Sequence, residues 1–213
     1  MSTFQFRTKL DLTLLLGRNA RNAAELHAGL LEIPAMSVYF HTHRFLQQHH
    51  YLSPEPPNDF AYWVTNVLND DVLGERLASI DIMQYGAIED IRQRFLTLLE
   101  EYLRSAGRRI DAPRGEEFHF MSCQTFAFPT RHAASTLAEF KDILKTVSIN
   151  VIYYHMFDAR LRPELGSNDF SLWIRDLGYP DLAQAVQALD PYSHTLEGLR
   201  NAIIRLIEAH GSH

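Results

Sequence analysis

A long internal repeat constrains the fold of this chain more than any other feature of its sequence. The segment FQFRT at 4–8 matches FHFMS at 118–122, which fixes an offset of 114 residues. The offset holds without a gap as far as His41 and His155, which correspond to each other. Such a period is far longer than that of any solenoid repeat.

A second motif extends the same repeat. Asn58-Asp59-Phe60 and Asn168-Asp169-Phe170 are each followed, three residues after the phenylalanine, by a tryptophan, Trp63 or Trp173. The chain has two tryptophans, and both occupy this position. Because the motifs recur in the same order, the sequence predicts an internal duplication.

The repeat predicts how the chain is divided. We expect repeat copy one at 1–103, a linker at 104–117 and repeat copy two at 118–210, packed as one globular unit. The linker concentrates Gly, Pro and charge, as exposed connections do. With 213 residues, 46% of them hydrophobic, the chain can bury one large core or two small ones.

The sequence predicts a mainly α, essentially all-α protein made of two pseudo-symmetric copies of a strand-plus-helices segment. Alternation of apolar and polar residues predicts a short strand at the start of each copy, at Phe4 and at Phe118. An isolated strand leaves its backbone groups unpaired, so we expect these two strands to form a small β-ribbon joining the copies. Apolar residues at helical spacing predict helices at 37–52 and 88–104.

Charge and composition exclude several classes of function. The net charge of −6 is spread over short alternations of sign, whereas phosphate binding needs clustered Lys and Arg, so no nucleic-acid partner is expected. No apolar run reaches the roughly 20 residues of a membrane span, so no membrane partner is expected. Cys123 is the one cysteine, which excludes an intrachain disulfide and predicts a cytoplasmic location.

The stretch HTHRFLQQHH supplies His41, His43, His49 and His50 as candidate metal ligands, for zinc or another divalent metal. On a helix His43 and His50 share a face, but His41 and His49 point elsewhere. The alternative interpretation is that His41 is a hydrogen-bonded packing residue and the other three are surface residues. No cofactor beyond such a metal is predicted.

Comparison of the copies narrows the candidate binding residues. His41 recurs as His155, but His43 is replaced by Phe157, so the residues confined to copy one, Arg44 among them, are where we expect an acquired function.

Asp59 and Asp169 have two interpretations. They form either the starts of capped helices or a pair of carboxylates facing each other across a pseudo-twofold axis.

The segment SVYFHTHRFLQQHHYLSPEPPNDFAYWV, with the flanking F-x-F and the final helix, resembles an uncharacterised family of bacterial and archaeal proteins, a domain of unknown function. The resemblance covers nearly the whole chain. It implies a prokaryotic, soluble and globular protein, and it implies no reaction and no site residue.

Three functions follow from these observations. The leading prediction is a noncatalytic binding or regulatory protein whose partner is an unknown protein or small molecule, with a homo-oligomer as an option. The alternative is a metal-dependent hydrolase that uses the histidines of copy one. A third is a small-molecule sensor that binds near His41 and His155.

Overall fold

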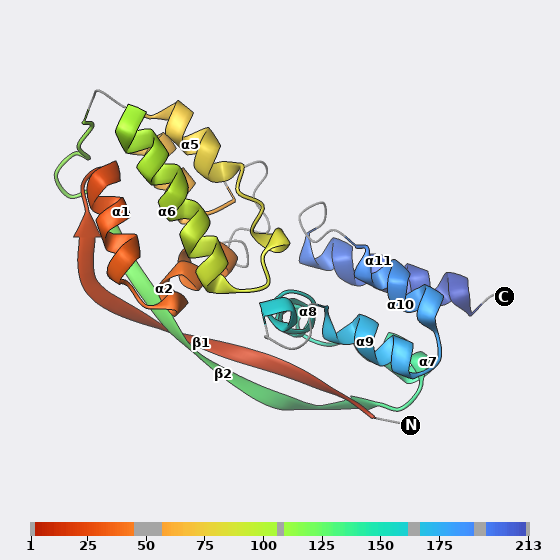
Figure 1. Cartoon of the computed structure of the whole chain (residues 1–213). Helices are drawn as coiled ribbons and strands as arrows, with labels where there is room; N and C mark the ends of the chain where they lie inside the picture. Colours follow the sequence, from red (N-terminus) through yellow and green to blue (C-terminus); the bar gives the residue numbers. More distant parts are fainter. Residues whose placement is uncertain (1–2, 45–56, 106–108, 162–166, 190–194, 212–213) are drawn as a thin grey trace. The chain divides into compact units, whose positions relative to one another are not determined.

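The computed structural model describes residues 3–44, 57–105, 109–161, 167–189 and 195–211. The chain forms two compact units (Figure 1). Unit 1 consists of Met1–Leu10 and Thr125–His213, and unit 2 consists of Asp11–Gln124.

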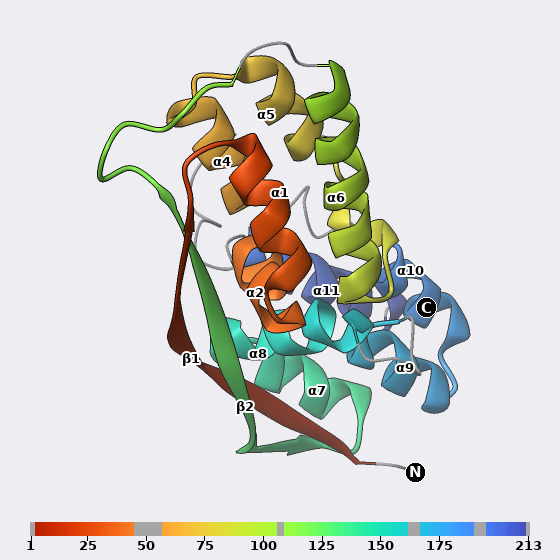
Figure 2. The same cartoon turned by 60° about the vertical axis from the view of Figure 1, so that its left-hand side comes forward.

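Two long strands pair with each other, β1 (Phe4–Ala20) and β2 (Phe118–Ala134), and each has 17 residues. Within unit 1 the Gln5 side-chain amide donates to the carbonyl of Thr130 at 2.8 Å, so the start of β1 lies beside the end of β2 and the pair is antiparallel. Among the described residues the sheet consists of these two strands (Figures 1 and 2).

The expectation of a mainly α, all-α chain with a small ribbon is wrong, because both strands are long. Residues 11–20 carry the run Leu14-Leu15-Leu16 in place of an alternation, and β2 contains Pro129, a residue that usually argues against a strand. The half-buried face that produces a period of two is absent from this part of each strand, so the sequence gives no strand signal there.

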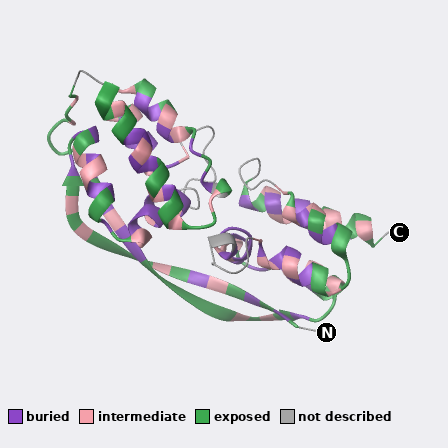
Figure 3. Cartoon of the chain, in the orientation of Figure 1, coloured by how far each residue is buried: buried purple, intermediate pink, exposed green. Residues whose placement is uncertain are grey.

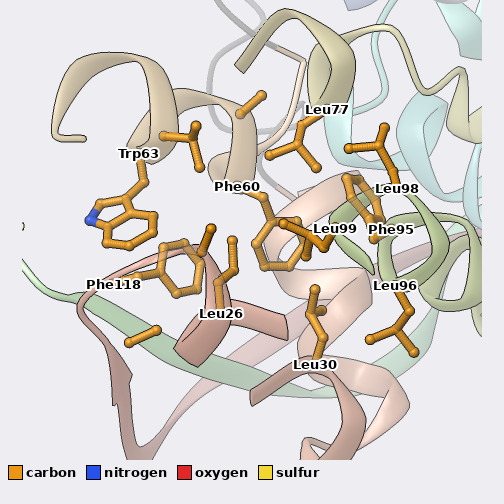
Figure 4. Packing of buried hydrophobic residues seen from close by; sticks show 14 of the residues in the cluster. Leu26, Leu30, Phe60, Trp63, Leu77, Phe95, Leu96, Leu98, Leu99 and Phe118 are labelled. Carbon is orange, nitrogen blue, oxygen red and sulfur yellow. The ribbon is translucent and has the colours of Figure 1, made fainter. Parts of the chain in front are cut away.

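The helices of unit 2 surround one apolar core. They are α1 (Ala23–Glu32), α2 (Ala35–Tyr39), α4 (Asp59–Asn66), α5 (Asp71–Ala78) and α6 (Ile88–Ser105). Helices α1 and α6 lie side by side (Figure 2), and Leu26, Leu30, Phe60 and Phe95 are fully buried among them (Figure 4). The predicted amphipathic helix at 88–104 corresponds to α6.

Unit 1 has a matching set of helices. They are α7 (Leu137–Leu144), α8 (Ile149–Met156), α9 (Asp169–Asp176), α10 (Pro180–Gln187) and α11 (Leu196–His210). In each unit an arginine of the last long helix donates to a carbonyl just after the first helix. Arg92 binds the carbonyl of Ile33 at 2.7 Å, and Arg200 binds that of Val147 at 2.7 Å.

The strands are exchanged between the two sets of helices. Phe118 and Phe120, which open the second sequence repeat, are buried in the core of unit 2 with the helices of the first. Phe4 and Phe6, which open the first repeat, pack on Phe140 of unit 1 at ring distances of 5.3 and 5.2 Å. The predicted repeat boundaries stay a prediction, and so does packing as one globular unit.

The described residues include no helix with the length and apolar character that a membrane crossing requires.

Candidate functional site

His41 of unit 2 is buried and uses both ring nitrogens within the protein. It lies in a π-helical turn (Phe40–Arg44) that continues α2. Its Nδ1 lies 2.6 Å from a carboxylate oxygen of Asp59, and its Nε2 accepts a 2.9 Å hydrogen bond from the backbone N–H of Met121 in β2. Because a backbone N–H can only donate, Nε2 is unprotonated and Nδ1 carries the proton that Asp59 accepts.

His155 repeats this arrangement in unit 1. Its Nδ1 lies 2.6 Å from an oxygen of Asp169, and its Nε2 accepts a 2.8 Å hydrogen bond from the backbone N–H of Arg7 in β1. The ring is equally buried. Both histidines therefore join a helix start to an exchanged strand.

This geometry agrees with the interpretation of His41 as a hydrogen-bonded packing residue. The imidazole lies among aromatic rings, 4.7 Å from Phe118 and 5.4 Å from Phe60 between centroids. A neutral imidazole with one donor and one acceptor is fully satisfied here. A general base needs a ring nitrogen directed at substrate, and Nε2 of His41 is directed at the strand.

Asp59 and Asp169 are the first residues of α4 and α9, and each binds the histidine of its own unit. The helix starts are capped by the preceding residues. Oδ1 of Asn58 accepts from the N–H of Ala61 at 2.9 Å, and Asn168 does the same for the corresponding N–H in α9. The predicted helix capping is confirmed, and a shared role of the two carboxylates stays a prediction.

His43 is buried, which corrects the interpretation of this residue as a surface histidine. Its ring stacks on Tyr39 at 5.5 Å with an interplanar angle of 7°, and its Nδ1 lies 3.1 Å from the hydroxyl of Thr42. In unit 1, Phe157 stacks in the same way on Tyr153 at 4.8 Å. His43 thus occupies an aromatic packing position.

Arg44 is the other candidate from copy one. Its guanidinium donates to the Thr13 hydroxyl at 2.7 Å and lies 4.7 Å from the centre of the Phe40 ring. It also lies 4.0 Å from the carboxylate of Asp11, whose side chain is buried. Arg44 therefore holds the middle of β1 against the π-helical turn.

The metal hypothesis stays a prediction. His49 and His50 lie outside the described residues, so the four histidines cannot be compared as a set. Within the described ranges, no three His, Cys, Asp or Glu side chains gather as a metal site requires.

An exposed apolar segment that was not predicted from the sequence lies in the middle of β1, where Figure 3 shows much of the strand as exposed. We call it the leucine strip, defined as Leu12, Leu14 and Leu15 of unit 2, whose exposed fractions are 52%, 40% and 81%. Two residues of β2, Phe126 and Phe128, are also exposed. The sequence signal was available in LTLLLG at 12–17, an apolar run without charge and too short for a typical helix.

Comparison with known proteins agrees with the architecture. The solved structure titled "The structure of OrfY from Thermoproteus tenax" is 32% identical in sequence, with a TM-score of 0.83, and the match covers 100% of this chain and 97% of that one. Curated proteins give no match. A family model described as "Family of unknown function (DUF5752)" matches residues 1–208. The chain therefore belongs to the DUF5752 family, whose function is unknown.

Proposed function

We propose that this chain is a noncatalytic binding or regulatory protein that holds a partner protein at the leucine strip. The observation that carries the proposal is the exposure of three leucines within four residues of one strand. The neighbouring helix α1 buries leucines of its inner face completely, and Leu26 and Leu30 are fully inaccessible. Contiguous exposed apolar surface of this kind marks interaction sites in folded proteins.

The position of the strip in a strand suggests how a partner binds. β1 has one hydrogen-bonded neighbour, β2, among the described residues, so its other edge carries backbone groups that a further strand can pair with. Addition of a strand to such an edge is a recurrent mode of peptide and protein recognition. It would place neighbouring side chains beside Leu12 and Leu14 on one face and beside Leu15 on the other.

Along the leucine strip, β1 lacks the features that normally prevent such pairing. Charged residues and proline on an edge strand block association. Residues 12–17 contain neither, whereas β2 carries Pro129 and Arg131 in its exposed part. The difference between the two strands supports a binding role for β1.

A noncatalytic role is also favoured by the two histidine–aspartate pairs. These are the side chains most suggestive of acid–base chemistry, and both imidazoles are occupied by an aspartate and a strand N–H. We include in the proposal a cytoplasmic location, as the single cysteine predicts.

The proposal is tested by placing a photo-crosslinking amino acid at Leu15 and, in a separate protein, at Leu31. Leu31 is a matched control because it is a leucine of α1 with 57% exposure outside the strip. Irradiation in an extract of the source cells should give a defined protein adduct from position 15 that Leu12→Lys abolishes. Equal adducts from both positions, or none from position 15, would contradict the proposal.

A further inference from the structure

We infer that the occupant of the leucine strip is the leucine strip of a second copy of this chain, paired antiparallel at the edge of β1 that has no strand neighbour among the described residues. This inference rests on the proposed function and names its partner. The first reason is charge. From Leu12 to Leu16 the strand has no charged residue, so two strips can lie together without placing like charges opposite each other.

The charges that flank the strip are already paired inside the chain. The carboxylate of Asp11 lies 4.0 Å from Arg44, and the Asp11 side chain is 6% exposed. Lys9 lies 2.8 Å from the carboxylate of Asp158 and 4.8 Å from the centre of the Tyr153 ring. On the other side Arg18 pairs with Glu32. The strip therefore presents an apolar surface without a net charge for a partner to match, which favours an equally apolar partner over an acidic or a basic one.

The exposed area is consistent with a dimer contact. At their exposed fractions the three leucines present on the order of 300 Å² of surface, more than a third of the roughly 800 Å² that each partner buries in a stable complex. Backbone groups and flanking polar residues such as Thr13 would supply the rest. A weak to moderate affinity follows, so the association should depend on concentration.

Antiparallel pairing of the two strips would also limit the assembly to two copies. In an antiparallel contact about a twofold axis each β1 edge is used once, which closes the assembly. The remaining edges belong to β2, where Pro129 lacks an N–H and Arg131 adds charge. A four-stranded sheet in the order β2, β1, β1, β2 would form, and sheets of three or more strands are more stable than a two-stranded ribbon.

The experiment is sedimentation equilibrium of the full chain over a wide range of concentrations. The wild type should show a monomer–dimer equilibrium, and Leu12→Lys/Leu15→Lys should shift its dissociation constant upward at least tenfold. The matched control is Leu31→Lys/Val72→Lys, which adds the same charge at side chains with 57% and 68% exposure elsewhere. It should dimerise like the wild type. Thermal melting followed by circular dichroism checks that both variants are folded.

Two sedimentation results would overturn the inference. One is a wild type that stays monomeric at every concentration, and the other is a dimer that persists unchanged in Leu12→Lys/Leu15→Lys. The crosslink at position 15 separates these failures from failure of the proposed function. An adduct with the mass of two chains supports the second copy, whereas an adduct with a different protein retains the proposed function and rejects the second copy. If Leu12→Lys/Leu15→Lys unfolds, the mass of the adduct that forms at position 15 without these substitutions still shows whether the partner is a second copy.

Discussion

The backbone N–H of Met121 donates a 2.9 Å hydrogen bond to Nε2 of His41, and this bond joins a strand from one sequence repeat to a helical segment of the other. The same relationship holds between Arg7 and His155 at 2.8 Å. Two repeats that exchange their first strands need a polar contact that fixes the register of each strand, because aromatic packing alone tolerates sliding. The buried imidazole provides that contact.

His41→Ala should therefore reduce the free energy of unfolding by about 2–4 kcal/mol, because it leaves a cavity among aromatic rings and an unpaired strand N–H. His155→Ala should have a similar effect. Asp59→Asn should cost less, about 1 kcal/mol, because the amide oxygen can still accept the Nδ1 proton. Urea denaturation measures all three.

The control for these variants is His119→Ala. His119 is exposed and lies between the buried Phe118 and Phe120, so its removal should change the stability by less than about 0.5 kcal/mol. A His41→Ala protein as stable as His119→Ala would show that the hydrogen bond to Met121 does not anchor the strand.

The sequence predicted a strand and a set of helices in each repeat. It did not predict that the two repeats exchange their strands. Asn58 and Asn168 cap helices as expected, because a cap is a local signal read from adjacent residues. The exchange of strands depends on which of two equivalent grooves each strand occupies. Phe4 and Phe118 both begin an F-x-F pattern, so this pattern does not separate the two outcomes.

A similar reason explains why some features of the candidate site were identified from the sequence and others were missed. The repeat drew attention to His41, Asp59, His155 and Asp169, which the structure brings together as two pairs. It could not reveal the strand N–H groups that bind the two histidines, because a sequence does not show which backbone groups lie near a given side chain. The leucine strip was missed because an apolar run alone does not show whether it is buried or exposed.

Gly29→Ala should destabilise the protein by about 1–3 kcal/mol although alanine favours helices. Gly29 lies in α1 where an added Cβ would overlap the Phe120 ring of β2. Gly29→Ala should cost less stability in the Phe120→Leu background than in the wild type, because the smaller side chain no longer overlaps the added Cβ. A double-mutant cycle by urea denaturation measures this coupling. Gly86→Ala is the control, since a Cβ there meets no atom within 4 Å. Additive effects would show that the two residues do not interact.

Tyr102 should be the source of a loss of stability at alkaline pH. Burial, together with the hydrogen bond to the carboxylate of Asp70 and the charge of that carboxylate, raises the pKa of Tyr102 from 10.0 to about 12. Since the folded pKa exceeds the unfolded one, the stabilisation is complete below pH 10 and is lost as the pH rises through about 12. Ultraviolet titration should show a late tyrosine step that Tyr102→Phe removes.

A matched variant separates the effect of Asp70 on the pKa of Tyr102 from the effect of burial. Asp70→Asn removes the charge and keeps Oδ1, which accepts from the N–H of Leu73 at 3.0 Å and caps α5. The late titration step should therefore move to lower pH while the stability at neutral pH changes little. A late step that remains at the same pH in Asp70→Asn would show that Asp70 does not raise the pKa.

His43→Phe should keep the fold and leave the metal content of the purified, untagged protein the same as that of the wild type. The reason is that Phe157 makes the equivalent ring stack on Tyr153 in unit 1, as His43 does on Tyr39. The variant loses the contact with the Thr42 hydroxyl, which still donates to the carbonyl of Val38 at 2.7 Å, so a loss of about 1 kcal/mol or less is expected.

Urea denaturation gives the stability, mass spectrometry of the elements gives the metal content, and the reciprocal Phe157→His is the control for the stack. A stoichiometric metal in the wild type that disappears in His43→Phe, with stability unchanged by Phe157→His, would instead identify His43 as a ligand and revive the hydrolase hypothesis.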